Sequence, residues 1–221
     1  MRIFQTLTTL ALCSTASAQG WVEYINTTDL FIVNFSGDPV VSETTHLSAF
    51  DVVLPARVYT VDNDRGRYEI TVVDYRGTEE RHRTKPGKTE ANSGRSLWIT
   101  DVRASVAHAA NNFRTRGGEV TYDAWADIDK IEGHQLQVTN RDRSRSFISI
   151  HLHMSRLYIL EGTVPEGAPA PGIFQQSLGI LDEEGRRIRY IIDAEGNRER
   201  IQVMHEWIGV DPELAGDQVI E

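Results

Sequence analysis

Apolar and polar residues alternate in short stretches through the first half of the chain, which is the period-two pattern of strands in a sheet with one wetter face. Residues 56–61 and 68–75 are rich in β-branched and aromatic side chains. Between them, residues 62–66 (DNDRG) supply what a hairpin turn requires. The pattern therefore predicts a hairpin, preceded by two further strands at residues 30–35 and 40–45.

A helical spacing of apolar residues follows a polar stretch. Residues 76–96 contain almost no apolar side chain, which predicts a long exposed loop or a short polar helix with a loop on either side. Beyond it, Thr100 or Asp101 can cap a helix that Gly117-Gly118 ends. Its apolar residues recur at helical spacing: Val102, Val106, Ala109, Ala110 and Phe113. We expect this amphipathic helix to cover the sheet.

The second half of the chain holds the longest predicted strands. They cover residues 119–131, 135–139, 146–154 and 157–162. Turn-forming residues separate them at 132–134, 140–144 and 155–156. Consecutive strands joined by such short turns predict an antiparallel meander.

A second helix and a last hairpin follow the meander. Prolines within residues 165–171 end the sheet, and Pro171 suits the first position of a helix. One face of that helix would carry Ile173, Phe174, Ser177, Leu178 and Leu181. Residues 187–192 and 198–204 predict a terminal hairpin. The fold class is therefore α+β, an antiparallel β-sheet meander with two packing α-helices.

The first residues have the pattern of a cleavable secretory signal. Arg2 supplies a positive n-region, residues 3–12 a short apolar region, and residues 16–18 (ASA) a cleavage site. Lipidation at Cys13 is an alternative, which the large Leu12 before it disfavours. We therefore expect a protein of the periplasm or a secreted protein, with a signal peptide at 1–18, a single α+β domain at 19–210 and an acidic C-terminal tail at 211–221.

The charge balance narrows the range of partners. Without residues 1–18, which include Arg2 and no acid, the chain has 22 basic and 32 acidic residues, a net charge of −10. Such a surface repels nucleic acid and anionic lipid, whose binding depends on Lys and Arg. No later apolar run reaches the length of a membrane span, so we expect no transmembrane segment. Cys13 lies in the signal, so the mature chain would have no disulfide and no thiol for metal or nucleophilic chemistry.

His151 and His153 form the best candidate for part of a metal site. Residues two apart on a strand project to the same face, where two imidazoles can share a zinc or copper ion. Further ligands would have to come from neighbouring strands, and the possible donors are His134, Asp123 and Glu161. Alternatively, the apolar residues of this strand face the core while Ser149 and the two histidines line the wetter face. The pattern leaves both interpretations open.

Other local motifs fail on spacing. The loops that begin at Asp62 and Asp127 open like calcium loops, but they lack an oxygen ligand at the third ligand position and a glutamate at the end. His205-Glu206 starts like a zinc-protease helix, but Gly209 occupies the place of the second histidine. The chain has no nucleophile elbow, phosphate loop or dinucleotide motif. Dispersed catalytic residues remain an alternative, which predicts a concave pocket with at least two titratable groups of perturbed pKa.

Arginines gather at two predicted turns of this acidic chain. One group lies in the meander (Arg141, Arg143 and Arg145), and the other surrounds the terminal hairpin (Arg186, Arg187, Arg189, Arg198 and Arg200). Guanidinium groups suit an anionic partner, such as a phosphorylated lipid head group or an acidic protein surface. Charged hairpin ends also protect sheet edges and keep a protein soluble. Both interpretations stay open.

Several stretches resemble the PsbP-like sandwich. WVEY (21–24) leads to FIVNFSGDP (31–39), an aromatic start followed by an apolar strand and a Gly-x-Pro turn. RLYILEGTVP (156–165) and FQQSL (174–178) look like the last strand and closing helix of those domains. As a whole the chain is similar to uncharacterised exported proteobacterial proteins. The residues from Arg186 onward lie beyond the pattern.

The resemblance implies binding rather than catalysis, because members of this fold are mostly non-enzymatic accessory or docking subunits. We therefore expect an exported, non-catalytic envelope binding or accessory protein without a cofactor. Its partner would be a protein or an anionic ligand, and not nucleic acid. Two other hypotheses remain: a periplasmic metal-binding protein that uses His151 and His153, and a hydrolase with dispersed catalytic residues.

Overall fold

The structure is a computed structural model that describes residues 20–86 and 96–201. The predicted signal peptide at 1–18 and acidic tail at 211–221 lie outside the described residues, as does the end of the predicted terminal hairpin at 202–204. Within the described part, no helix is long and apolar enough to cross a membrane.

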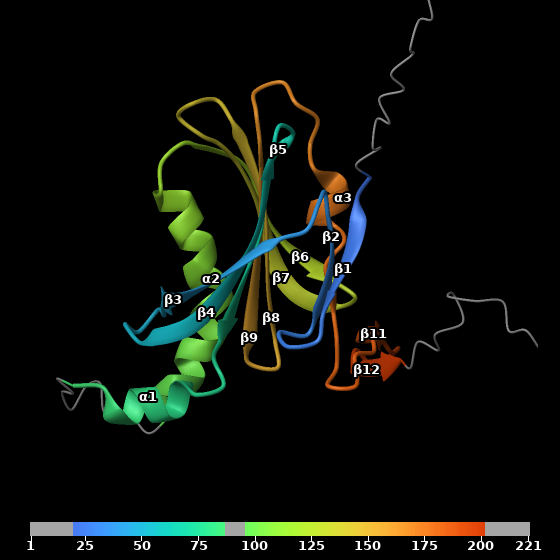
Figure 1. Ribbon diagram of the computed structural model, residues 1–221. Coiled ribbons are helices and arrows are strands. Elements are labelled where there is room, and N and C mark those ends of the chain that lie inside the picture. Colours follow the sequence, from blue (N-terminus) through green and yellow to red (C-terminus); the bar gives the residue numbers. More distant parts are fainter. Residues whose placement is uncertain (1–19, 87–95, 202–221) are drawn as a thin grey trace, which may run out of the picture.

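A seven-stranded antiparallel sheet runs through the centre of the molecule (Figure 1). Its spatial order is β3-β4-β5-β9-β8-β7-β6, so two meanders join where β5 pairs with β9. The strands are β3 (Val40–Leu47), β4 (Val53–Asn63), β5 (Gly66–Asp74), β6 (Glu119–Ile128), β7 (Ile131–Thr139), β8 (Arg145–His153) and β9 (Arg156–Val164). The predicted antiparallel sheet is thus confirmed, and its hairpin at 56–75 is the β4–β5 pair.

Helix α2 covers one face of this sheet (Figure 1). Two helices, α1 (Thr78–Thr84) and α2 (Leu97–Thr115), connect β5 to β6. Val106 and Ala109 of α2 share a buried cluster with Leu136 and Ile148 of the sheet, because removing these apolar surfaces from water is favourable. The amphipathic helix predicted here is therefore present, and it begins before the predicted caps.

A second sheet covers the other face (Figure 1). It consists of β1 (Val22–Asn26), β2 (Phe31–Phe35) and β10 (Gly179–Ile180), and the short helix α3 (Gly172–Gln175) lies beside it. Aromatic rings fill the space between the sheets: the ring centroids of Phe31 and Tyr59 are 5.0 Å apart, and those of Phe35 and Phe174 are 5.4 Å apart. The molecule thus has three layers, with the seven-stranded sheet in the middle.

Strand β8 is buried on both faces, so the predicted wetter face of this strand was wrong. Ser149, His151 and His153 are only 2%, 1% and 8% exposed. On the opposite side of the strand, Ile148 and Ile150 belong to the cluster under α2. The reason is that segments after β9 cover this face: Gln175 of α3 donates to the Ile148 carbonyl, and Tyr190 packs against His153.

The turn between β6 and β7 lies at Asp129-Lys130, earlier than the predicted turn at 132–134. Both residues have positive φ, 50° and 63°, as a two-residue type I′ hairpin turn requires. Gly133 instead lies inside β7, where a Cβ atom would collide with Nδ1 of His151. This glycine therefore serves the close approach of two strands rather than a turn.

The second predicted helix is only one turn long, and the chain then enters β10. Pro171 is the N-cap of α3, one position before the first helical residue that was predicted for it. The Asn34 N–H donates to the hydroxyl of Ser177 at 2.8 Å, and β10 pairs with β2. Because these contacts with β2 hold the backbone in an extended form, the helical face predicted to continue to Leu181 does not form.

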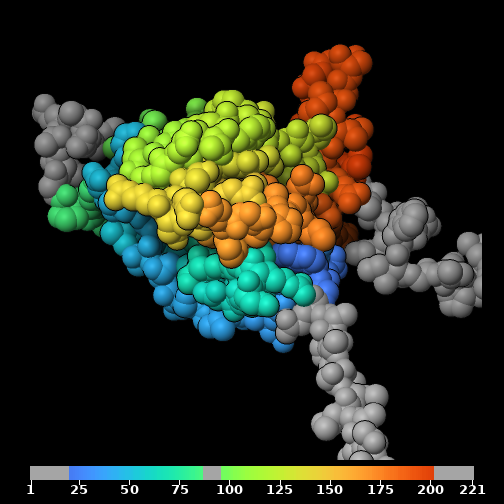
Figure 2. Space-filling view, turned by 90° about the horizontal axis from the view of Figure 1, so that it is seen from above, coloured from blue at the N-terminus to red at the C-terminus, as the bar shows by residue number. Residues whose placement is uncertain are grey.

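A terminal hairpin of β11 (Arg189–Ile192) and β12 (Arg198–Ile201) projects from the body (Figure 2). The Tyr190 N–H donates to the carbonyl of Asp129 at 3.1 Å, and the Tyr190 ring lies 5.9 Å from that of His153. The predicted hairpin is therefore confirmed over the residues that the structure describes.

Candidate functional site

A cavity of about 250 Å³ lies between the β1–β2 turn and the adjoining ends of β3, β4, β5 and β9. Its wall contains six charged side chains: Asp29, Glu43, Arg57, Asp74, Arg76 and Arg156. Three arginines and three acids therefore meet here although they come from five separate segments of the chain. Strand pairing explains how, because the order β3-β4-β5-β9 makes neighbours of these segments.

The first ion pair of this cavity fastens the β1–β2 turn to the sheet. Nη1 of Arg57 donates to Oδ1 of Asp29 at 2.7 Å, and the Tyr59 hydroxyl donates to Oδ2 at 2.6 Å. The Tyr158 hydroxyl donates to the Asp29 carbonyl at 3.0 Å. The Asp29 carboxylate is thus held by two donors and fully engaged.

The second ion pair lies at the C-terminal end of β5. Arg76 donates to both carboxylate oxygens of Asp74, with distances of 2.9 and 2.6 Å. These hydrogen bonds are the main reason that the pKa of Asp74 lies below its usual value. Asp74 therefore remains ionised near neutral pH and compensates Arg76.

Arg156 is the charged residue of this wall that no ion pair engages. It is only 8% exposed and stands opposite Asp74 in the β5–β9 register. Within residues 20–86 and 96–201, its guanidinium takes part in no hydrogen bond and no ion pair. None of its nitrogens is fully buried, so the guanidinium faces the cavity, where Asp74 acts on it by charge alone. The cavity can therefore receive an anionic group, which the planar guanidinium binds through two parallel hydrogen bonds.

The histidines proposed as metal ligands are engaged in the core. Nδ1 of His151 contacts the Ile131 carbonyl at 3.2 Å, and Nε2 contacts the Ser149 hydroxyl at 2.9 Å. Both ring nitrogens of His151 thus have protein partners. His153 packs against Tyr190, and its Nε2 is buried without a hydrogen-bond partner among the described residues.

The structure does not bring the other proposed metal ligands to these histidines. His134 pairs with Ile150 in the register and so projects to the α2 face, where it contacts Asp123. Glu161 forms an ion pair of 2.6 Å with Arg116. Among the described residues, no group of three His, Cys, Asp or Glu side chains is arranged to hold a metal ion. The residues singled out for a metal are therefore divided between the two faces of the sheet.

We expect acid to weaken the fold through His153. Burial, and then the charges of Arg198 and Arg200, lower its pKa from 6.5 to about 4, so the folded state resists a proton that the unfolded state accepts. Stability should therefore fall as the pH drops from 6.5 towards 4, by on the order of 1 kcal/mol after allowance for solvent screening. Urea unfolding at pH 7 and pH 4.5 should show a smaller loss in His153→Gln than in wild type. Equal losses in the two proteins would contradict this.

The arginines of the β7–β8 turn are used within the molecule. Arg143 forms an ion pair of 3.3 Å with Glu166, and Arg145 donates to the Ala168 carbonyl. Arg141 lines an open hollow of about 480 Å³ at the C-terminal end of α2. These contacts tie the turn to the loop after β9.

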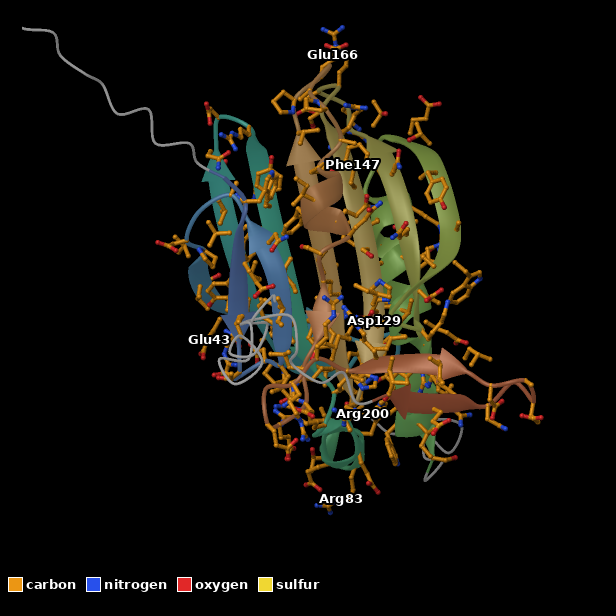
Figure 3. All side chains as sticks on the ribbon, turned by 90° about the vertical axis from the view of Figure 1, so that its right-hand side faces the viewer. Glu43, Arg83, Asp129, Phe147, Glu166 and Arg200 are labelled. Carbon is orange, nitrogen blue, oxygen red and sulfur yellow. The ribbon has the colours of Figure 1, made fainter. Side chains whose placement is uncertain are left out.

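The arginines around the terminal hairpin serve to attach it. Asp129 binds Arg187 and Arg189, at 2.8 and 3.4 Å. Asp182 binds Arg186 at 3.0 Å and also Arg200 of β12. Figure 3 shows Asp129 and Arg200 at the base of the projecting hairpin. These arginines thus compensate two buried or half-buried carboxylates.

A polar cluster between α1, α2 and the end of β3 bears on the hydrolase hypothesis. Oδ2 of Asp101 accepts hydrogen bonds from the Ser48 hydroxyl at 2.6 Å and contacts Nε2 of His82 at 2.8 Å. The carboxylate thus lies between the serine and the histidine, whereas an activated serine needs its own contact with the base. Within the described chain, four more buried polar atoms of this region have no partner: His46 Nε2, Tyr75 Oη, Asp101 Oδ1 and Ser105 Oγ.

Sequence reasoning missed the cavity arginines. Arg57 and Arg76 are single charges in or just after strands, and Arg156 was assigned to a tight turn. A usable signal was present in the pattern itself, because charged residues bound the apolar runs: Asp74 is the last residue of β5 and Arg156 the first of β9. What no local pattern contains is the pairing that places these two ends together.

No protein-family model and no curated protein sequence matches the chain. Among solved structures, it is similar to the solution structure of cyanobacterial PsbP (CyanoP) from Synechocystis sp. PCC 6803, with 13% sequence identity and a TM-score of 0.36. The match covers 71% of this chain and 87% of that chain. A similarity of this size concerns the fold alone and says nothing about function.

Proposed function

We propose that this chain is an exported, non-catalytic binding protein that holds an anionic group of its ligand at Arg156. The observation that supports this is an arginine of the cavity wall that is only 8% exposed as a residue and forms no hydrogen bond or ion pair with the described chain. A guanidinium without a hydrogen-bond acceptor of its own can form two charge-assisted hydrogen bonds with a bound carboxylate. A ligand anion supplies the missing partner.

The chemistry of the wall favours binding over catalysis. Arginine remains protonated in proteins and cannot move a proton. Asp74 has a lowered pKa because of Arg76, so it is a weak base and is not protonated near neutral pH. Asp29 is engaged by Arg57 and Tyr59. The arginines and aspartates of this wall can therefore bind a charged group of a ligand, which is what a binding site requires.

Titration with small anions tests this proposal. We expect acetate added to the full chain to shift the amide NMR signals of Asp74 and Arg156, and Arg156→Met to weaken this binding by about 10- to 100-fold, the worth of one charge-assisted hydrogen bond. Inorganic phosphate serves as a second probe. The matched control is Arg103→Met, an exposed arginine of α2 away from the cavity.

Measuring the stability of Arg156→Met distinguishes a loss of binding from a loss of folding. Because Arg156 forms no hydrogen bond or ion pair with the described chain, unliganded Arg156→Met should be about as stable as wild type in urea unfolding. The proposal is overturned if acetate and phosphate bind equally well to wild type and Arg156→Met, or if they bind to neither protein.

A further inference from the structure

Outside its two short ion pairs, the cavity wall has one further charge of each sign. The pairs Asp29–Arg57 and Asp74–Arg76 are each neutral. What remains is the cation Arg156 and the anion Glu43, which the described chain engages only in a long ion pair of 3.8 Å with Arg57. A ligand with a single negative charge would leave Glu43 uncompensated in the same wall.

Glu43 is free to receive a cation. It lies on β3, at the edge of the sheet (Figure 3), and its side chain is 85% exposed. Its contact with Arg57 is 3.8 Å long, which is beyond hydrogen-bond distance. Moreover, Arg57 already donates to Asp29. The Glu43 oxygens can therefore accept hydrogen bonds from an ammonium group at the mouth of the cavity.

The two unmatched charges lie at opposite ends of the cavity. Arg156 stands on β9 and Glu43 on β3, with β4 and β5 between them. Three strand spacings separate the backbones, about 14 Å, and the side chains shorten this distance as they reach into the same cavity. A ligand that meets both must carry its charges at its two ends.

On the basis of the proposed function, we infer that the ligand is a zwitterion whose terminal carboxylate binds Arg156 and whose terminal ammonium binds Glu43. Two sources have this chemistry, an ω-amino acid and a short peptide. Both have the carboxylate and the ammonium separated by several bonds. A phosphate dianion fits less well, because Asp29 and Asp74 lie in the same wall and repel a second negative charge near Arg156.

A matched pair of probes tests the ammonium contact. Hexanoate and ε-aminohexanoate have the same chain length and differ at the far end by the ammonium group. We expect the full chain to bind ε-aminohexanoate about fivefold more tightly than hexanoate, which is the upper range for an ion pair with an exposed partner. Triglycine, measured in the same way, distinguishes a peptide from an amino acid by its relative affinity.

Variants at the rim separate this inference from the proposed function. Glu43→Gln should bind hexanoate as wild type does but lose the preference for ε-aminohexanoate, whereas Glu23→Gln, at an exposed acid on β1, should keep it. If wild type binds both probes equally and the binding of both requires Arg156, the inference of a zwitterionic ligand is wrong, but the proposed anion site at Arg156 is retained. If neither probe binds, or Arg156→Met binds both as wild type does, the anion site itself is wrong.

Discussion

Replacing Phe174 by alanine is expected to destabilise the protein by about 3–5 kcal/mol, the usual cost of deleting a buried aromatic ring. Phe174 is fully buried, and its ring centroid lies 5.4 Å from that of Phe35 and 5.5 Å from that of Tyr68. It thereby joins α3 to both sheets. The cavity left in Phe174→Ala has rigid strands on two sides and cannot collapse easily. Equilibrium urea unfolding measures the effect.

The neighbouring residue provides a control for this change. Ile173 belongs to the same helical turn but is 53% exposed. Ile173→Ala should change the free energy of unfolding by less than about 0.5 kcal/mol. Similar losses for the two variants would mean that the effect arises from α3 itself and not from the aromatic layer between the sheets.

Removing the Asp101 carboxylate should cost about 3 kcal/mol, because Asp101→Ala leaves two buried polar partners unsatisfied. Asp101 is fully buried, and it accepts the Ser48 hydroxyl at 2.6 Å and contacts His82 at 2.8 Å. It thus fastens the loop after β3 and the helix α1 to α2. The loss is measured by urea unfolding at pH 7.

Two variants make the Asp101 result specific. Asp101→Asn keeps the shape and one oxygen acceptor, so it should lose less stability than Asp101→Ala. Asp38→Ala removes an exposed acid and should change stability by less than about 0.5 kcal/mol. Wild-type stability in Asp101→Ala would show that the polar cluster contributes nothing to the fold.

Local patterns predicted the elements whose own residues carry the signal. The β4–β5 hairpin combines β-branched strands with a DNDRG turn, and α2 combines apolar residues at helical spacing with glycines at its end. Such features depend on neighbours in sequence, where turn chemistry and amphipathic spacing act. The antiparallel sheet and its covering helix could be predicted for that reason.

Elements that depend on distant partners were misjudged. Gly133 has the composition of a turn, yet it lies inside β7 because the ring of His151 packs where its Cβ would be. The segment after Pro171 has a helical pattern, yet β2 takes part of it as β10. In both cases tertiary contacts outweighed a local preference of less than about 1 kcal/mol per residue.

The sequence by itself determined the strands of the seven-stranded sheet, the amphipathic helix and the balance of acidic and basic residues. Spacing and composition act locally and can be followed along the chain. Only the tertiary structure decided that α3 and Tyr190 of β11 cover the histidine face of β8, and that Asp74 and Arg156 meet beside Arg57. The physical reason is strand order. Pairing β5 with β9 brings together residues that lie far apart in sequence. Which acidic side chains lie near Arg156 depends on that pairing.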